Sequence, residues 1–333
     1  MKNVSVSFII PYYKVEISLL ERALDSIMKL DENADWEVWV IDDGTPDSKA
    51  REYVLSLGHP RIHYHLQHNS GPGGARNTGM KLAGKEYIQF VDADDYLFTG
   101  NLIQVLDMLG EERPDLLAFG FRKVRNNGMK SLRVSDISGH VLFRGDGVQF
   151  MLTHNLHGSV WSYIFKKSMA GNLRFTPVAY HEDEEFTALL FLRMQYIITT
   201  DLPVYAYCLR ENSIMHHKGR EVLEKRFFDL LHVIERLHAK CVKLEGRTAR
   251  ALSKRIDMLC MSMVYSLLAD SPDSAFLTAL LQRMRQVHLY PLPSRRYSVV
   301  YSLVRRFTLT IPRAVASGKV FRLLRLGHIG RAS

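Results

Sequence analysis

The sequence has few cysteines and no long apolar run. Its three cysteines, Cys208, Cys241 and Cys260, are odd in number and far apart, which leaves no disulfide framework and no cysteine spacing typical of a metal site. We therefore expect a reducing compartment, the cytoplasm. No apolar segment reaches the roughly 20 residues of a membrane-spanning helix. The N-terminus leads directly into the strand-like VSVSFII, so we expect no signal peptide.

Acidic residues are missing from the C-terminal part of the chain. The 333 residues include 44 Lys and Arg against 35 Asp and Glu, and the last acid is Asp273. Nine basic residues between Arg295 and Arg331 equal this excess of +9, so the rest of the chain is neutral. Nothing in it resembles a known nucleic-acid-binding module, and we expect no nucleic-acid partner.

The basic segment also contains many Val, Leu, Phe and Tyr residues. Arginine mixed with apolar side chains is typical of a segment that lies on an anionic membrane surface. We therefore predict that residues 291–333 form a basic amphipathic tail in peripheral contact with the inner face of the plasma membrane. The alternative is a helix that packs on its own domain with a hydrated basic side.

The first hundred residues alternate between strand and helix patterns. Four segments are strand-like: Val4–Ile10, Trp36–Ile41, Arg61–Leu66 and Tyr87–Val91. Helical spacing of apolar residues separates them, which indicates an α/β fold with a mostly parallel sheet. Two further strands are expected at 115–121 and 195–201, and the pattern becomes helical beyond Arg220. We predict a domain over residues 1–217, a helical extension over 218–290 and the tail over 291–333.

Polar and small residues follow each of the first four strands. They are Pro11–Tyr13, Asp42–Asp43, Asn69–Arg76 and Asp92–Asp95. Ligands of open α/β sheets bind beyond the carboxyl ends of the strands. We therefore expect these segments to meet at one edge of the sheet, although they are scattered in the sequence.

The motif DADD places Asp92, Asp94 and Asp95 within four positions. Like charges this close need a compensating partner or exposure to water. A solvated loop is one interpretation. A second is a divalent metal completed by a substrate diphosphate, because Mg²⁺ often takes one or two carboxylates plus phosphate oxygens. A third is a metal-dependent phosphohydrolase, with Asp92 as nucleophile and Asp94 as acid/base.

The loop QHNSGPGG leads into a helical ARNTGMKLA, and the stretch NSGPGGARNTG provides small residues and one cation, Arg76, near the expected helix start. Small residues let a backbone approach a ligand closely. The spacing is not that of a dinucleotide-binding loop, because Arg76 occupies the position of the third glycine. This excludes NAD binding.

Four blocks occur in one order: SFIIPYYK, IDDGTPDS, NSGPGGARNTGMKLAGKEYIQFVDADDYL and HEDEEF. Together they resemble the family 2 glycosyltransferases over about residues 4–217. WSYIFKKS and YCLRENSIMHH continue the resemblance. It implies a GT-A fold and inverting transfer from a nucleotide-sugar, most simply a UDP-sugar. The acceptor would be a glycan or lipid-linked saccharide hydroxyl in cell-surface polysaccharide synthesis. Lys14 and Thr99 depart from the family pattern beside the expected site, where Asn and Pro are usual.

The resemblance also implies roles for individual residues. The donor would contact Pro11, Tyr13, Asp42 or Asp43, Asn69, Arg76 and Asp92. Asp94 would bind Mn²⁺ or Mg²⁺, while Asp95 would be structural. In the RENSIMHH segment, Arg210 and Ser213 would hold the diphosphate and His216 would be a further metal ligand. The phosphohydrolase is less favoured, since Tyr96 stands where that class has Thr or Val.

The second acidic cluster, HEDEEF, contains four acids before an apolar helical pattern. Acids stabilise the first turn of a helix through its dipole, which explains some of them without catalysis. The resemblance assigns Asp183 as the general base and Glu182 as an acceptor contact. Trp161 either offers a flat face to the acceptor sugar or is a core residue. A non-catalytic homologue that docks on membranes is a further alternative.

Overall fold

The computed structural model describes residues 4–31, 34–125, 139–209, 219–295 and 298–318. The chain divides into two compact units, residues 1–213 and 214–333, which are described separately. A further division at residue 291 stays a prediction.

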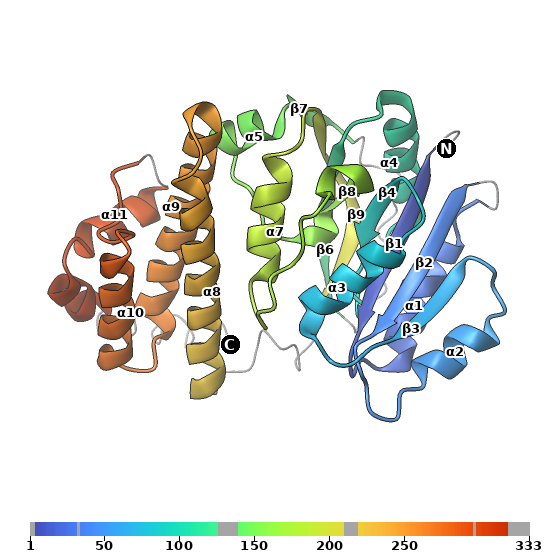
Figure 1. Cartoon of the computed structure of the whole chain (residues 1–333), viewed down its shortest axis with the longest axis horizontal. Helices are drawn as coiled ribbons and strands as arrows, with labels where there is room; N and C mark the ends of the chain where they lie inside the picture. Colours follow the sequence, from blue (N-terminus) through green and yellow to red (C-terminus); the bar gives the residue numbers. More distant parts are fainter. Residues whose placement is uncertain (1–3, 32–33, 126–138, 210–218, 296–297, 319–333) are drawn as a thin grey trace. The chain divides into compact units, whose positions relative to one another are not determined.

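The first unit contains one mixed sheet with helices against it (Figure 1). The strand order is β3-β2-β1-β4-β8-β6-β9-β5, and β7 pairs with β9. Parallel pairing joins β3, β2, β1 and β4, and also β6 with β9. The strands are β1 Ser5–Tyr12, β2 Asp35–Asp42, β3 Ile62–Leu66, β4 Tyr87–Phe90, β5 Tyr96–Leu97, β6 Leu116–Arg125, β7 Val141–Gly145, β8 Tyr163–Lys166 and β9 Ile197–Leu209.

The two faces of β1 pack against different helices. Phe8 and Ile10 belong to a buried cluster that also includes Leu24 of α1 and Leu102 of α4. Ile9 points to the other face, where α3 packs with Gly79 directly against it. The helices of this unit are α1 Ile17–Met28, α2 Ala50–Ser56, α3 Gly71–Leu82, α4 Thr99–Glu112, α5 Gly147–Thr153, α6 Lys167–Ala170 and α7 Glu182–Phe191.

The expected α/β class is confirmed, but one boundary was wrong. From the sequence we expected the loop QHNSGPGG to precede a helix that begins with ARNTGMKLA, whereas α3 already begins at Gly71 with Pro72 in its first turn. Proline is tolerated there because the first N–H groups of a helix have no intrahelical partner. The glycines of this segment are therefore part of the helix start.

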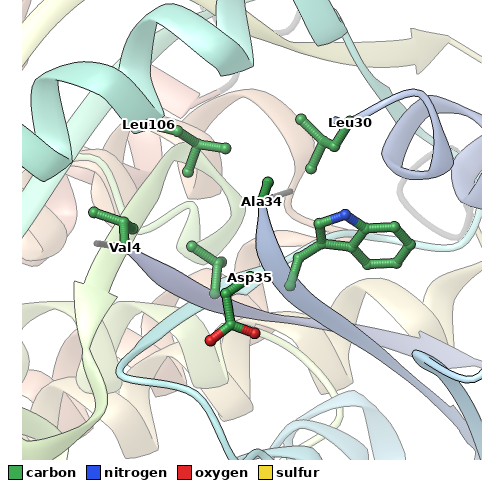
Figure 2. Close-up of a pocket in the computed structure, with 7 residues that line it drawn as sticks. Val4, Leu30, Ala34, Asp35 and Leu106 are labelled. Atoms are coloured by element: carbon green, nitrogen blue, oxygen red, sulfur yellow. The ribbon is translucent and has the colours of Figure 1, made fainter. Parts of the chain in front are cut away.

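A small cavity lies at the amino ends of β1 and β2. Val4, Leu30, Ala34, Asp35 and Leu106 are among its lining residues (Figure 2). Its volume of about 10 Å³ is close to the minimum for one water molecule. This cavity is at the opposite end of both strands from Asp42–Asp43 and is too small for a substrate.

The second unit consists of helices. They are α8 Arg220–Cys241, α9 Gly246–Asp270, α10 Ser274–Gln286 and α11 Val299–Phe307. Asp273 caps α10 by accepting a hydrogen bond from the backbone N of Phe276 at 2.8 Å. Arg283 of α10 forms an ion pair with Glu235 of α8 at 2.8 Å. Across the parts of the chain described here, no helix is both long and apolar enough to span a membrane.

We predict that Gly79→Ala destabilises the protein. A Cβ at position 79 would lie 2.2 Å from Cγ2 of Ile9, a β-branched core side chain that cannot move aside easily. Overpacking of this kind costs about 1–3 kcal/mol. Helix propensity alone would favour alanine by about 1 kcal/mol. Urea unfolding should show a loss of stability in Gly79→Ala and little change in the exposed control Lys81→Ala. A gain of stability in Gly79→Ala would contradict this packing.

Candidate active site

The carboxyl ends of β1 and β2 lie side by side, since Tyr12 and Asp42 are partners in the parallel register. Asp42 is fully buried. Its Oδ1 accepts from the backbone N of Thr45, and its Oδ2 from the hydroxyl of Tyr64, both at 2.9 Å. Burial together with this carboxylate raises the pKa of Tyr64 to about 12, so the phenol stays protonated and can donate. Asp42 thus holds the loop after β2.

Asp43 organises the segment that leads into α3. Its Oδ1 accepts from Gln67 Nε2 at 2.6 Å and from the backbone N of Ser70 at 2.9 Å. Asn69 Nδ2 donates to the backbone oxygen of Asp43 at 3.0 Å. Gly44 has φ +77°, and a Cβ there would lie 3.1 Å from the backbone N of Asn69. The turn after β2 therefore requires glycine.

The acidic motif after β4 divides into exposed and buried positions. Asp92 and Asp94 are partly exposed, whereas Ala93 and Asp95 are buried. The backbone N of Asp95 donates to the backbone oxygen of Asp92 at 3.0 Å, which closes the turn. Arg22 of α1 donates to the backbone oxygen of Asp94 at 2.7 Å. The turn thus leaves two of its three aspartates partly exposed and buries the third.

Tyr205 and Asp95 connect this turn to β9. The Tyr205 hydroxyl accepts from the backbone N of Asp92 at 3.0 Å and donates to Asp95 Oδ2 at 2.9 Å. Asp95 Oδ1 accepts from the backbone N of Cys208 at 2.7 Å. Burial, followed by the charge of Asp92, raises the pKa of Asp95 to about 7 despite these donors. Each polar group of this link has a partner, which fixes the backbone of Asp92.

Arg76 of α3 joins both acidic clusters. Its Nη2 lies 3.0 Å from Asp92 Oδ1, and its Nη1 lies 2.5 Å from Glu182 Oε1. The guanidinium carbon lies 6.0 Å from the ring centroid of Phe90 and 5.6 Å from that of Phe175. Burial lowers the pKa of Arg76, but the negative charges of Asp92 and Glu182 raise it by more. The net shift of this pKa is therefore upward. One buried cation therefore links the end of β4 to the start of α7.

Asn77, the next residue of α3, fixes the segment before α7. Its Nδ2 donates to the backbone oxygen of Phe175 at 3.0 Å, and its Oδ1 accepts from the backbone N of Phe175 at 2.8 Å. Phe175 stacks on Phe186 of α7 with centroids 4.0 Å apart. Thr176 Oγ1 donates to Glu185 Oε2 at 2.5 Å. The position of the first turn of α7 is therefore set from both sides.

Asp183 is surrounded by charge at the start of α7. His181, the residue before this helix, has φ +65°, and four acids occupy the first turn. Burial and the carboxylates of Glu182 and Glu184 raise the pKa of Asp183 well above its ordinary value, whereas Arg76 lowers it. A raised pKa makes the ionised carboxylate a stronger proton acceptor, which suits a general base.

Trp161 packs within an aromatic group. Its ring stacks on Tyr205 with centroids 4.4 Å apart and an interplanar angle of 19°. Tyr207 lies 5.8 Å from it, and the half-exposed Phe121 meets it edge to face at 5.1 Å. Trp161 is itself only partly buried. Tyr205, whose hydroxyl also bonds the backbone of Asp92, therefore covers one face of the Trp161 ring.

The described residues contain no cluster of three or more His, Cys, Asp or Glu side chains able to hold a metal. A divalent ion completed by a diphosphate requires only one or two carboxylates. Asp92 retains 27% of its side-chain exposure, Asp94 is partly exposed, and both offer hard oxygen ligands. The donor set therefore fits Mn²⁺ or Mg²⁺.

The structure brings together Arg76, Asp92, Glu182 and Asp183, and it joins Asp43 to Asn69. Pro11 and Tyr13 lie at the end of β1, where the exposed Tyr13 ring lies 5.0 Å from Lys14 Nζ.

Glu182, expected at the acceptor, is buried and bonded to Arg76. Arg210, Ser213 and His216 lie outside the described residues.

Sequence reasoning missed several residues that position this site. Tyr64, Gln67, Asn77 and Tyr205 each hold a predicted residue or segment through a hydrogen bond. Asn77 adjoins Arg76 in the ARN motif and was detectable by that proximity. Tyr205 lies within an apolar strand more than a hundred positions from Asp92, and no local pattern marks it.

Comparison with known proteins agrees with this geometry. Residues 7–170 match the model of the family described as glycosyl transferase family 2. An uncharacterised glycosyltransferase, EpsJ of Bacillus subtilis, is 28% identical over 220 residues, covering 63% of this chain and 62% of EpsJ. A Campylobacter jejuni GalNAc(5)-diNAcBac-PP-undecaprenol β-1,3-glucosyltransferase is also 28% identical, over 63% of this chain and 66% of its own length. The chain thus spans less than two thirds of either relative.

The fold is also found in a solved structure. Residues 1–349 of TarS from S. aureus, crystallised with UDP-GlcNAc, superpose with a TM-score of 0.57 at 17% identity. The superposition covers 96% of this chain and 92% of the TarS chain. With its GT-A-like sheet and the motif match over residues 7–170, the chain belongs to the family 2 glycosyltransferases.

Proposed function

We propose that this chain transfers a sugar, with inversion, from a nucleotide-sugar to a saccharide hydroxyl. The main observation in support is that the Arg76 guanidinium forms ion pairs with both Asp92 and Glu182. These ion pairs bring the two acidic clusters together in one site. The donor would be a UDP-sugar, and the acceptor a glycan or lipid-linked saccharide of cell-surface polysaccharide synthesis. A relative that is named for an undecaprenol-linked substrate and a TarS structure solved with UDP-GlcNAc support this choice.

The donor would lie over the carboxyl ends of β1, β2 and β4. Tyr13 offers an exposed ring for the base, and the loop held by Asp43 and Asn69 lies beside it. Arg76 has Asp92 and Glu182 as ion-pair partners, so we assign it to positioning these carboxylates rather than to free contact with the diphosphate. Asp94 would hold Mn²⁺ or Mg²⁺, with Asp92 beside it in contact with the donor; when bound, the ion supplies positive charge for the departing diphosphate.

Asp183 would act as the general base. The acceptor hydroxyl loses its proton to the Asp183 carboxylate as its oxygen forms a bond to the anomeric carbon. The bond from that carbon to the diphosphate oxygen breaks with its electron pair, on the opposite face of the sugar. Burial and the charges of Glu182 and Glu184 raise the pKa of Asp183 and so its affinity for the proton, whereas Arg76 lowers that pKa. Trp161 remains our proposal for the acceptor side.

The family match favours the transferase over the phosphohydrolase. A cytoplasmic location and peripheral contact with a membrane through the basic segment are part of the proposal. No observation on the described residues favours a second activity.

We expect Asp183→Asn to abolish transfer without loss of donor binding. The amide keeps the shape of the carboxylate but cannot take the proton, and loss of a general base typically costs about 10²–10⁴-fold in rate. UDP release should be measured with a lipid-linked saccharide acceptor, and donor binding by thermal shift with UDP-sugars and Mn²⁺. Turnover near the wild-type rate would remove Asp183 from the catalytic role, whereas loss of donor binding would show a folding defect instead.

The pH dependence of transfer offers a second test. Asp183 must be ionised to act as base, so the raised pKa places the acid limb of the kcat profile above the ordinary carboxyl range. Glu184→Gln removes a negative neighbour and should lower the pKa of Asp183, which shifts this limb to lower pH. Glu221→Gln, in the first turn of α8, serves as the matched control. An acid limb that stays in place in Glu184→Gln would argue that another group titrates.

Tyr205→Phe tests the positioning of Asp92. The substitution deletes one oxygen, leaves the ring that stacks on Trp161, and removes hydrogen bonds to Asp92 and Asp95. Asp92 belongs to the same turn as Asp94, the proposed metal ligand, and loss of an outer partner of a metal site commonly weakens metal binding by about 10–100-fold. We expect weaker Mn²⁺ and donor binding by calorimetry. Tyr207→Phe is the control, since its hydroxyl makes no hydrogen bond to the described residues. Equal affinities in both variants would refute the link.

A further inference from the structure

Helix α11 exposes a continuous apolar surface. Val299 is 78% exposed, and Val300, Leu303 and Phe307 are each 50–52% exposed. At about 100° per residue, these four positions fall within a single arc of about 100° on the helix. We call these four residues the apolar arc. Isolated exposed apolar residues are normal, but four on one helix face form a patch that indicates an interaction site.

The opposite side of α11 is packed firmly within its unit. Val304 is fully buried and Thr308 almost so. The backbone oxygen of Thr308 accepts a hydrogen bond from the hydroxyl of Tyr290. Arg305 Nε donates to the backbone oxygens of Leu292 at 3.1 Å and Pro293 at 3.0 Å. The apolar arc is therefore displayed on a docked helix.

The surroundings of the apolar arc are cationic. Arg306 borders the arc on the helix, and Arg313 follows shortly after; both are exposed. No Asp or Glu occurs after Asp273 in the whole sequence. An apolar strip flanked by arginine and free of acids complements an anionic lipid surface, where acyl chains lie beneath phosphate groups.

A second copy of this chain is a poorer occupant. A two-fold interface apposes identical surfaces, so Arg306 and Arg313 of one copy would approach those of the other. No acid in residues 274–333 could neutralise them. Stable dimers also bury about 800 Å² per partner, more than four side chains supply.

We propose that α11 is the membrane-docking helix of this protein. It lies flat on an anionic leaflet, with the apolar arc in the interfacial region and Arg306 and Arg313 at the lipid phosphates. This deepens the membrane contact included in the proposed function, but it does not depend on sugar transfer.

The test is co-sedimentation of the full chain with vesicles of equimolar phosphatidylglycerol and phosphatidylcholine. Leu303→Ser/Phe307→Ser should reduce the fraction bound by about 10-fold or more, because it removes apolar area from the interface. The matched control is Leu142→Ser/Val242→Ser, which replaces two exposed apolar residues elsewhere and should bind as the wild type does. Arg306→Gln/Arg313→Gln should weaken binding and reduce its sensitivity to salt.

Three further measurements make the result decisive. Thermal unfolding must be alike in all variants, so that a folding defect is recognised. Thermal shift with UDP-sugar and Mn²⁺ should be unchanged in the α11 variants, which separates this proposal from the donor site. Unchanged vesicle binding by Leu303→Ser/Phe307→Ser overturns the proposal. The proposal is also overturned if light scattering shows a dimer for the wild type and a monomer for Leu303→Ser/Phe307→Ser, because the apolar arc would then bind a second copy.

Discussion

The architecture of the candidate active site depends on one buried cation. Arg76 lies near the rings of Phe90 and Phe175 and pairs with Asp92 and Glu182, which come from distant parts of the sequence. Removing one partner of a buried ion pair typically costs about 3–5 kcal/mol, because the other charge stays desolvated and uncompensated. The three residues therefore constrain one another: the buried guanidinium needs both acids, and each acid is held at a defined distance from it. Its Nε is buried without a hydrogen-bond partner among the described residues, so the side chain is held through its two terminal nitrogens.

A second constraint acts on the other side of Asp92. Tyr205 and Asp95 connect its backbone to β9, while Arg76 holds its side chain. Aromatic stacking continues this connection from Tyr205 to Trp161. The acidic turn is thus fixed before any ligand arrives. Such preorganisation matters for chemistry in which charge develops on a leaving group, since the surrounding dipoles need not reorient.

Much of this could be predicted from the sequence, for identifiable physical reasons. The apolar runs Val4–Ile10 and Trp36–Ile41 are local signals, and they became β1 and β2. The geometry of parallel strands then brought Tyr12 and Asp42 to one edge of the sheet, as expected. Individual side-chain partners were a different matter. Nothing local shows that Glu182 bonds Arg76, or that Tyr205 accepts from Asp92, because both contacts depend on how distant elements pack. The same limit applies to α3, whose start at Gly71 was hidden by helix-disfavouring glycines and a proline.

The link between Asp95 and Cys208 bridges 113 positions of the chain. A nascent polypeptide leaves the ribosome from its N-terminus, so β1, β2 and β4 are free to assemble while β9 is still inside the exit tunnel. Asp95 gains its two donors only when Tyr205 and Cys208 have emerged. Synthesis of the first unit must therefore be nearly complete before the acidic turn after β4 reaches its final hydrogen bonding.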